Sequence, residues 1–181
     1  ESLVNQGAIF QSTSDTETIL QLVARSKRGR MVDKIVDALF QIQGAYSLVI
    51  LTNKKLIGVR DPYGIRPLVL GDLNGAPVLA SETCALDIIG AKYLRDIENG
   101  EIIIISEEGV ESIKPFPKVS ERPCIFERIY FSRPDSIIGG KTVYSYRKNL
   151  GEQLAKENPI DVDVVIPVPD SGVPAALGFS Q

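Results

Sequence analysis

The stretch LIGVRDPYGIRPLVLG, residues 56–71, consists of two apolar runs on either side of a polar loop. Apolar runs of this length around a loop that contains Gly and Pro predict two short strands joined by a turn. The loop sets Arg60 and Arg66 beside that turn, and two arginines so placed can orient a carboxylate. The alternative is a proline-stiffened hairpin in which both arginines only bridge local carboxylates.

Other short strands are predicted around this stretch, with turn signals between them. The predicted strands span residues 46–51, 56–60, 67–70, 78–80 and 102–105. Two helices are predicted before them. Ser14 and Glu17 match a capping box at the start of the first, and residues 30–43 have the apolar spacing of the second. Helices packed on an antiparallel sheet make an α+β domain.

A second domain is predicted beyond KPFPKVSERP, residues 114–123, whose three prolines and mixed charges are typical of an interdomain crossing. A strand at 125–131, a helix at about 142–157 and a strand at 162–166 follow. A helix that leads into a strand is typical of an α/β domain. These few elements cannot bury a core of their own.

Composition excludes several classes of function. A net charge of −3 gives no electrostatic reason to expect a nucleic-acid or membrane partner. The chain has no histidine, so it supplies no Ser-His-Asp triad and no imidazole metal ligand. Its two cysteines, Cys84 and Cys124, form no C-x-x-C pair and no disulfide framework. With no signal peptide and no long apolar run, a cytoplasmic protein is expected.

The last stretch, VVIPVPDSGVPAALGFSQ at residues 164–181, predicts a strand, the polar turn Asp170-Ser171-Gly172 and the start of a helix. A strand, a Ser/Gly loop and a helix N-terminus together can hold a phosphate. The alternative is a capped helix start with Asp170 as the cap and Pro174 in the first turn.

A series of motifs runs in one order along the chain: STSDTE, GAYSLVIL, RDPYGIRPL, ASETCALD, GEIIII, YFSRPDS and VVIPVPDSG. Together they resemble the glutamine phosphoribosylpyrophosphate amidotransferase (amidophosphoribosyltransferase) family. RDPYGIRPL and ASE are shared loosely with other class II amidotransferases. The stretch YFSRPDSIIGGKTVYSYRKNLG, residues 130–151, followed by VPDSG, points to the purine enzyme in particular.

The resemblance implies a fold and a domain order. Residues 1–119 are expected to be the later, α+β portion of a class II, N-terminal-nucleophile glutamine amidotransferase domain. Residues 120–181 are expected to open an α/β type I phosphoribosyltransferase domain. The chain is therefore expected to be an internal fragment, with its nucleophilic cysteine upstream of Glu1 and its nucleotide motif beyond Gln181. No catalytic residue is assigned, and the fragment alone is expected to be inactive.

The resemblance also implies a function. The enzyme would make 5-phosphoribosylamine from phosphoribosyl pyrophosphate and glutamine, the first committed step of de novo purine (IMP) synthesis. Ammonia released from glutamine would displace pyrophosphate from the Mg²⁺-bound substrate. A homo-oligomer inhibited by purine nucleotides is expected. Two alternatives stay open: another class II amidotransferase, such as a glucosamine-phosphate or asparagine synthase, and a truncated, non-catalytic binding protein.

Site residues follow from the same resemblance. Asp15 matches the acidic residue that binds the amino group of glutamine; the alternative is a capping residue at the positive helix end, and both roles can hold together. Arg60 and Arg66 are candidates for shaping the glutamine pocket.

At the other end of the chain, Ser171 is expected near Mg²⁺ and pyrophosphate. Asp170 and Gly172 are expected to bind the substrate there, with Gly172 letting the backbone approach the pyrophosphate closely. Cys124 matches the first of four ligands of a 4Fe-4S cluster found in one branch of the family; a buried apolar cysteine is the alternative. Cys84 is expected to belong to the core.

Overall fold

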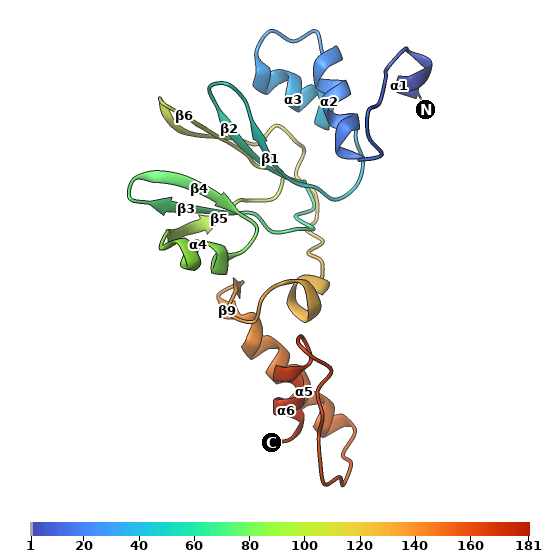
Figure 1. The fold of residues 1–181 in the computed structure, drawn as a ribbon, viewed down its shortest axis with the longest axis vertical. Coiled ribbons are helices and arrows are strands. Elements are labelled where there is room, and N and C mark those ends of the chain that lie inside the picture. The colour runs from blue at the N-terminus through green and yellow to red at the C-terminus, as the bar shows by residue number, and fades with distance from the viewer. Residues whose placement is uncertain (1) are drawn as a thin grey trace. The chain divides into compact units, whose positions relative to one another are not determined.

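The computed structural model describes residues 2–181, and the chain divides into two compact units, one up to Gly44 and one from Ala45 onward (Figure 1). The first unit is helical, with α1 (Ser2–Asn5), α2 (Thr16–Arg25) and α3 (Met31–Leu39). Helix α3 is amphipathic as predicted, and it buries Ile35, Ala38 and Leu39. Both predicted helices of this region are therefore confirmed.

The predicted capping box at the start of α2 is wrong. Asp15, not Ser14, occupies the N-cap position. The carboxylate of Glu17 accepts hydrogen bonds from the backbone N–H groups of Gln11 and Ser12, both at 2.8 Å, and from Ser12 Oγ at 2.6 Å. These bonds, that of the Ser12 hydroxyl first, lower the pKa of Glu17. The loop before the helix thus supplies the donors that the capping box would have supplied.

The second unit contains two larger antiparallel sheets and, later in the chain, one of two short strands, where a single sheet was predicted. The first has the order β1-β2-β6-β7 and consists of β1 (Ser47–Leu51), β2 (Leu56–Arg60), β6 (Ile102–Ser106) and β7 (Gly109–Ile113). The second has the order β4-β3-β5 and consists of β3 (Val69–Leu73), β4 (Ala76–Ala80) and β5 (Lys92–Asp96). The α+β class and all five predicted strands of this region are confirmed, whereas β5 and β7 were not predicted.

The two sheets pack on each other through a cluster of aliphatic side chains. Its buried members are Leu68, Leu70, Ile97 and Ile103, with Leu79 and Ile105 beside them. A Cβ atom at Gly58 would lie 2.8 Å from both Ile103 Cγ2 and Leu79 Cδ1, so only glycine at this position lets the sheets approach this closely.

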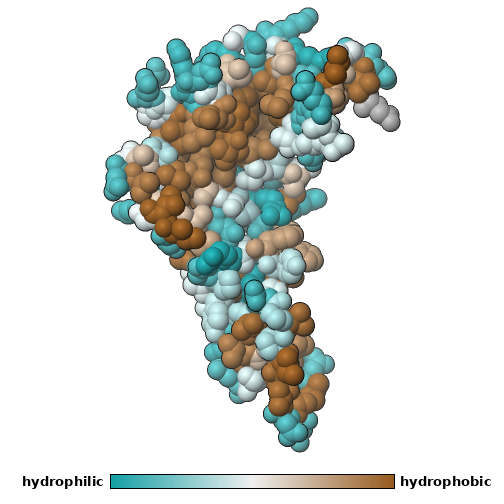
Figure 2. Space-filling view, viewed as in Figure 1, coloured by the Kyte–Doolittle hydropathy of each residue, from teal (hydrophilic) through white to brown (hydrophobic). Residues whose placement is uncertain are grey.

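Helix α4 (Thr83–Ile89) covers the other face of the second sheet, where Leu86 packs with Val69 and Ala91. The order of layers in this unit is therefore sheet, sheet, helix. Figure 2 shows apolar side chains gathered over the strands of the unit, among which Val49 and Leu51 of β1 are exposed.

The predicted strand at 125–131 is wrong. Glu127–Phe131 forms a single π-helical turn. Its backbone finds partners locally, since Arg128 and Ile129 both donate to the carbonyl of Ile125 at 3.0 and 3.2 Å. A strand would have needed a neighbouring strand for these same groups.

The predicted strand at 162–166 is also absent. These residues are extended, but no strand pairs with them in the part of the chain that the structure describes. Val164 and Ile166 are 69% and 81% exposed. An apolar run alone does not form a strand when nothing lies beside it to accept its hydrogen bonds.

The predicted helix at 142–157 is confirmed as α5 (Val143–Glu157), with the Thr142 side chain accepting a bond from Ser145 N. The two-residue strands β8 (Ile137–Ile138) and β9 (Lys141–Thr142) precede it, and α6 (Val173–Phe179) packs against it. A Cβ at Gly151 or Gly178 would clash with backbone of the opposite helix, which explains the glycines at this crossing. No helix within residues 2–181 is long and apolar enough to cross a membrane.

Candidate functional site

The loop between β2 and β3 is fixed from within by Arg60. Its guanidinium donates to the carbonyl oxygens of Arg66 at 2.9 Å, Ile97 at 2.7 Å and Gly64 at 3.1 Å. All three acceptors are backbone carbonyls of this protein, so these bonds hold the loop in place. Arg60 therefore sets the shape of the loop, and its predicted contact with glutamine stays a prediction.

Asp61, which sequence reasoning missed, anchors the same loop. It is fully buried, and its two carboxylate oxygens accept hydrogen bonds from Tyr63 N at 2.9 Å and Ile65 N at 3.1 Å. Burial, together with the charge of Asp61, raises the pKa of Tyr46 to about 12. The available signal was an aspartate directly before a Pro-x-Gly turn, where its side chain can bond the backbone two residues on.

Arg66 contacts the segment that follows the predicted crossing. Its Nε lies 2.5 Å from Oε1 of Glu127, in an ion pair without the alignment of a hydrogen bond, and its guanidinium stacks 4.5 Å from the Phe131 ring centroid. Glu127 is buried, and its other oxygen accepts a bond from Ser132 Oγ at 3.0 Å. The predicted role of Arg66 in the glutamine pocket is not tested by these contacts.

Cys124 adjoins the same loop, since its backbone N–H donates to the carbonyl of Ile65 at 3.1 Å. The residue is half-buried. Cys84 is buried in the core, as predicted, and burial raises the pKa of its thiol. Across residues 2–181, no group of three or more His, Cys, Asp or Glu side chains is arranged to hold a metal ion. The described residues alone therefore do not form a cluster site.

Asp15 is exposed at the N-cap position of α2, but its side chain makes no capping hydrogen bond. Its nearest polar contact is the Thr16 hydroxyl at 3.5 Å. The N-cap position that the alternative explanation gave to Asp15 is confirmed, although the side chain makes no capping hydrogen bond. Its carboxylate remains exposed to solvent at the positive end of a helix.

The turn at 170–172 leads into α6 with Gly172 as the N-cap residue and Pro174 in the first turn. Asp170 does not occupy the cap position, so its predicted capping role is wrong. Gly172 is required here, because a Cβ would lie 2.6 Å from the carbonyl oxygen of Val168. The predicted roles of this turn in binding pyrophosphate stay predictions.

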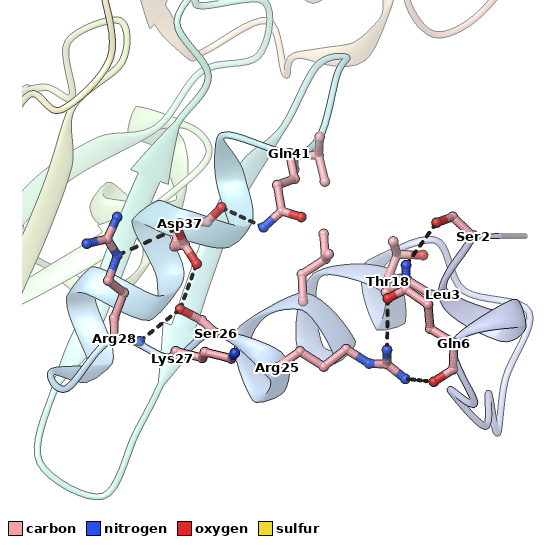
Figure 3. Close-up of a pocket in the computed structure, with 12 residues that line it drawn as sticks. Ser2, Leu3, Gln6, Thr18, Arg25, Ser26, Lys27, Arg28, Asp37 and Gln41 are labelled. Carbon is pink, nitrogen blue, oxygen red and sulfur yellow. Dashed lines mark hydrogen bonds and ion pairs between the residues drawn. The ribbon is translucent and has the colours of Figure 1, made fainter.

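A cavity of about 810 Å³ lies among the helices of the first unit (Figure 3). Two of its basic side chains are already paired: Arg25 donates to Gln6 Oε1 and O at 3.2 Å, and Arg28 lies 3.7 Å from Asp37. Ser26 Oγ donates to the same Asp37 at 2.7 Å. None of the predicted site residues lines this cavity.

Comparison with known proteins connects the chain to one family. Residues 1–87 match a model described as a glutamine amidotransferase domain. The amidophosphoribosyltransferase of Rhizobium etli is 56% identical over 99% of this chain, and that of Bacillus subtilis is 46% identical over 100%. A chloroplastic amidophosphoribosyltransferase of Glycine max is 53% identical over 97% of the chain.

A solved structure gives the same result. The glutamine phosphoribosylpyrophosphate amidotransferase of B. subtilis, complexed with ADP and GMP, matches 99% of this chain with a TM-score of 0.95 and 47% identity. The chain covers 39% of that structure, and 37%, 31% and 38% of the R. etli, G. max and B. subtilis sequences. It therefore spans about a third of the length of these proteins.

Proposed function

Because this chain is homologous to amidophosphoribosyltransferases along almost its whole length, we propose that the protein containing it makes 5-phosphoribosylamine from glutamine and phosphoribosyl pyrophosphate. The observation that carries the proposal is the 56% identity over 99% of the chain. Relatives of this name match residues before and after the predicted crossing alike, which favours this function over another class II amidotransferase. A truncated, non-catalytic binding protein is the remaining alternative.

The assay that tests the proposal measures three rates on the full-length protein: glutamine hydrolysis, glutamine-dependent synthesis of phosphoribosylamine and ammonia-dependent synthesis. All three are expected. Synthesis requires phosphoribosyl pyrophosphate, supplied as its Mg²⁺ complex. A protein that binds both substrates but produces neither glutamate nor phosphoribosylamine would be the non-catalytic alternative.

The proposal divides the chain between two half-reactions. Residues 1–119 would belong to the glutaminase domain, where Asp15 would bind the ammonium of glutamine and Arg60 and Arg66 would shape its pocket. Residues 120–181 would begin the phosphoribosyltransferase domain, where the turn at 170–172 would receive the pyrophosphate. Neither cysteine of the chain is at an N-terminus, so neither is proposed as the glutaminase nucleophile.

Ser171 provides the test of the phosphoribosyl end. Ser171→Ala is expected to weaken use of phosphoribosyl pyrophosphate about tenfold in both synthetic reactions, because it removes a hydroxyl that can reach the metal or a phosphate oxygen. Glutamine hydrolysis should be kept. Asp170→Asn is the control, since it leaves Ser171 in place. Unchanged kinetics in Ser171→Ala would make the turn structural only.

We also propose that Cys124 contributes one ligand of an iron–sulfur cluster in the full-length protein. One thiol cannot hold such a cluster, so this chain would supply one part of the site and no step of the reaction. Cys124→Ser is expected to lose iron and visible absorbance, whereas Cys84→Ala, a matched change in the core, should keep both. If the wild-type protein were active but iron-free and colourless, Cys124 would serve only in packing.

Regulation and assembly are proposed from the same relatives. The B. subtilis structure was solved with ADP and GMP, which supports inhibition of this protein by purine nucleotides. A homo-oligomer and a cytoplasmic location are proposed with it; the plant relatives are described as chloroplastic.

A further inference from the structure

Glu82 sits where β4 passes into α4, yet its side chain does not cap the helix. Its Oε2 atom accepts a hydrogen bond from Arg133 N at 2.8 Å and another from Ser136 Oγ at 2.7 Å. The next residue contacts the same loop: Thr83 Oγ1 accepts a hydrogen bond from Ile137 N at 2.9 Å. Two adjacent side chains are thus committed to a loop more than fifty residues later in the chain.

These contacts are partly buried: Glu82 is half-buried and Arg133 is exposed, but two of their partners are buried. Thr83 is 5% exposed and Ser136 only 1%. A hydrogen bond to a carboxylate is stronger than one between neutral groups, and a buried partner left without it pays the full cost of desolvation. We name this set of bonds, formed by residues 82 and 83 with residues 133, 136 and 137, the 82–136 joint.

The loop held by the joint is bound just as firmly to α5. The carbonyls of Pro134 and Ser136 accept bonds from Tyr144 N at 2.8 Å and Val143 N at 2.9 Å. The buried side chain of Arg147 donates to the carbonyl of Ser132 at 2.8 Å. The loop therefore links α4 to the first turns of α5, and Figure 1 shows β9 below α4, with α5 running downward from it.

A second contact runs parallel to the joint. The β2–β3 loop meets the π-helical turn through the Arg66–Glu127 pair, and Glu127 bonds Ser132 at the start of the same loop. Glutaminase-side elements thus hold one loop at both of its ends. A loop held at two points has little freedom to rotate. Such a loop can keep the glutamine site and the phosphoribosyl site at a fixed distance from each other.

We propose that Glu82 is a positioning residue: through the 82–136 joint it keeps the glutamine site and the phosphoribosyl site aligned, so that ammonia passes between them without escaping. The inference rests on the proposed function. Glu82 itself touches neither substrate in this scheme. Its loss should leave each half-reaction intact and impair only their coupling.

The test compares the three rates defined above in Glu82→Ala and Glu82→Gln. Glutamine-dependent synthesis is expected to fall about tenfold in Glu82→Ala, the low end of what losing hydrogen bonds to a charged group costs, while ammonia-dependent synthesis and glutamine hydrolysis stay within about twofold. More glutamate should then be released for each phosphoribosylamine formed. Glu82→Gln keeps an acceptor oxygen and should recover part of the coupling.

Two further variants separate positioning from stability. Asp135→Ala removes a carboxylate of the same loop that pairs only with the Arg133 side chain, at 2.9 Å, and should stay coupled. Ser136→Ala removes the donor to Glu82 and should reproduce the uncoupling. Combined with Glu82→Ala, it should add little, because both changes remove the same bond between Ser136 Oγ and Glu82 Oε2.

The possible outcomes distinguish a positioning role of Glu82 from a purely structural role. If all three rates fall together with the melting temperature, Glu82 is only structural and the inference is overturned. It is also overturned if the wild type is coupled and both Glu82→Ala and Ser136→Ala stay coupled. A folded wild type that makes no phosphoribosylamine from either nitrogen source would overturn the proposed function first.

Discussion

Replacing Glu101 with alanine is expected to destabilise the unit from Ala45 onward by about 3 kcal/mol, the low end of what breaking a buried ion pair costs. Glu101 is 1% exposed. Its carboxylate accepts a bidentate pair of bonds from Arg95 at 2.7 and 2.9 Å, a bond from Ser112 Oγ at 2.6 Å and one from Glu98 N at 2.7 Å. Without it, Arg95 and Ser112 lose their acceptor. The low end applies because the Arg95 side chain is 41% exposed.

The pH dependence of this effect has a defined direction. Burial alone would raise the pKa of Glu101, but the hydrogen bonds from Arg95, then Ser112 and Glu98 N, outweigh it and lower the pKa to about 2. Because the folded pKa lies below the ordinary value of 4.5, the stabilisation is complete above about pH 4.5 and is lost as the pH falls toward about 2.

Urea unfolding of wild type and Glu101→Ala measures this difference. The gap between the two free energies should be full at neutral pH and shrink between pH 4.5 and 2. Glu98→Ala is the matched control: it also breaks a carboxylate–cation pair, at 2.5 Å to Lys114, but both partners are at least half-exposed and the expected cost is about 0–1 kcal/mol. If the two variants lost the same free energy of unfolding, the buried Glu101 pair would not have the stabilising role expected of it.

Asp15→Asn is expected to weaken glutamine use by about tenfold to a hundredfold if Asp15 has the role proposed above, since it removes the charge that would bind the substrate ammonium. Ammonia-dependent synthesis should be largely kept. The α2 helix should be unaffected, because the Asp15 side chain makes no capping bond and Asn suits the N-cap position equally well. The measurement is the kcat/KM for glutamine beside the rate with ammonia, on the full-length protein.

The control for this variant is Asp33→Asn. Asp33 is a carboxylate in the first turn of the neighbouring helix and pairs with Arg30 at 2.8 Å. Its replacement should leave both rates unchanged. If Asp15→Asn behaves in the same way, Asp15 serves only the helix start.

Local patterns predicted most elements of this protein. The spacing of apolar residues predicts strand β2 and helices α3 and α5 without knowledge of what packs against them. Their apolar residues fall on one face or in one short run. Strands β5 and β7 are not predicted in this way: KYLRD and GVESI are mixed or polar, and they become strands because β3 and β6 present unpaired edges to them.

The amino-acid sequence by itself determined the family, the α+β class and the candidate residues. Motifs and their order along the chain can be recognised without knowing how the chain folds. Only the tertiary structure decided what several charged groups do. Arg60 bonds carbonyls of its own loop and of the distant Ile97, and Glu101 and Glu82 bond partners on other strands and loops. The physical reason is that a charged side chain must be paired when it is buried, and its partner is set by packing between segments distant in sequence.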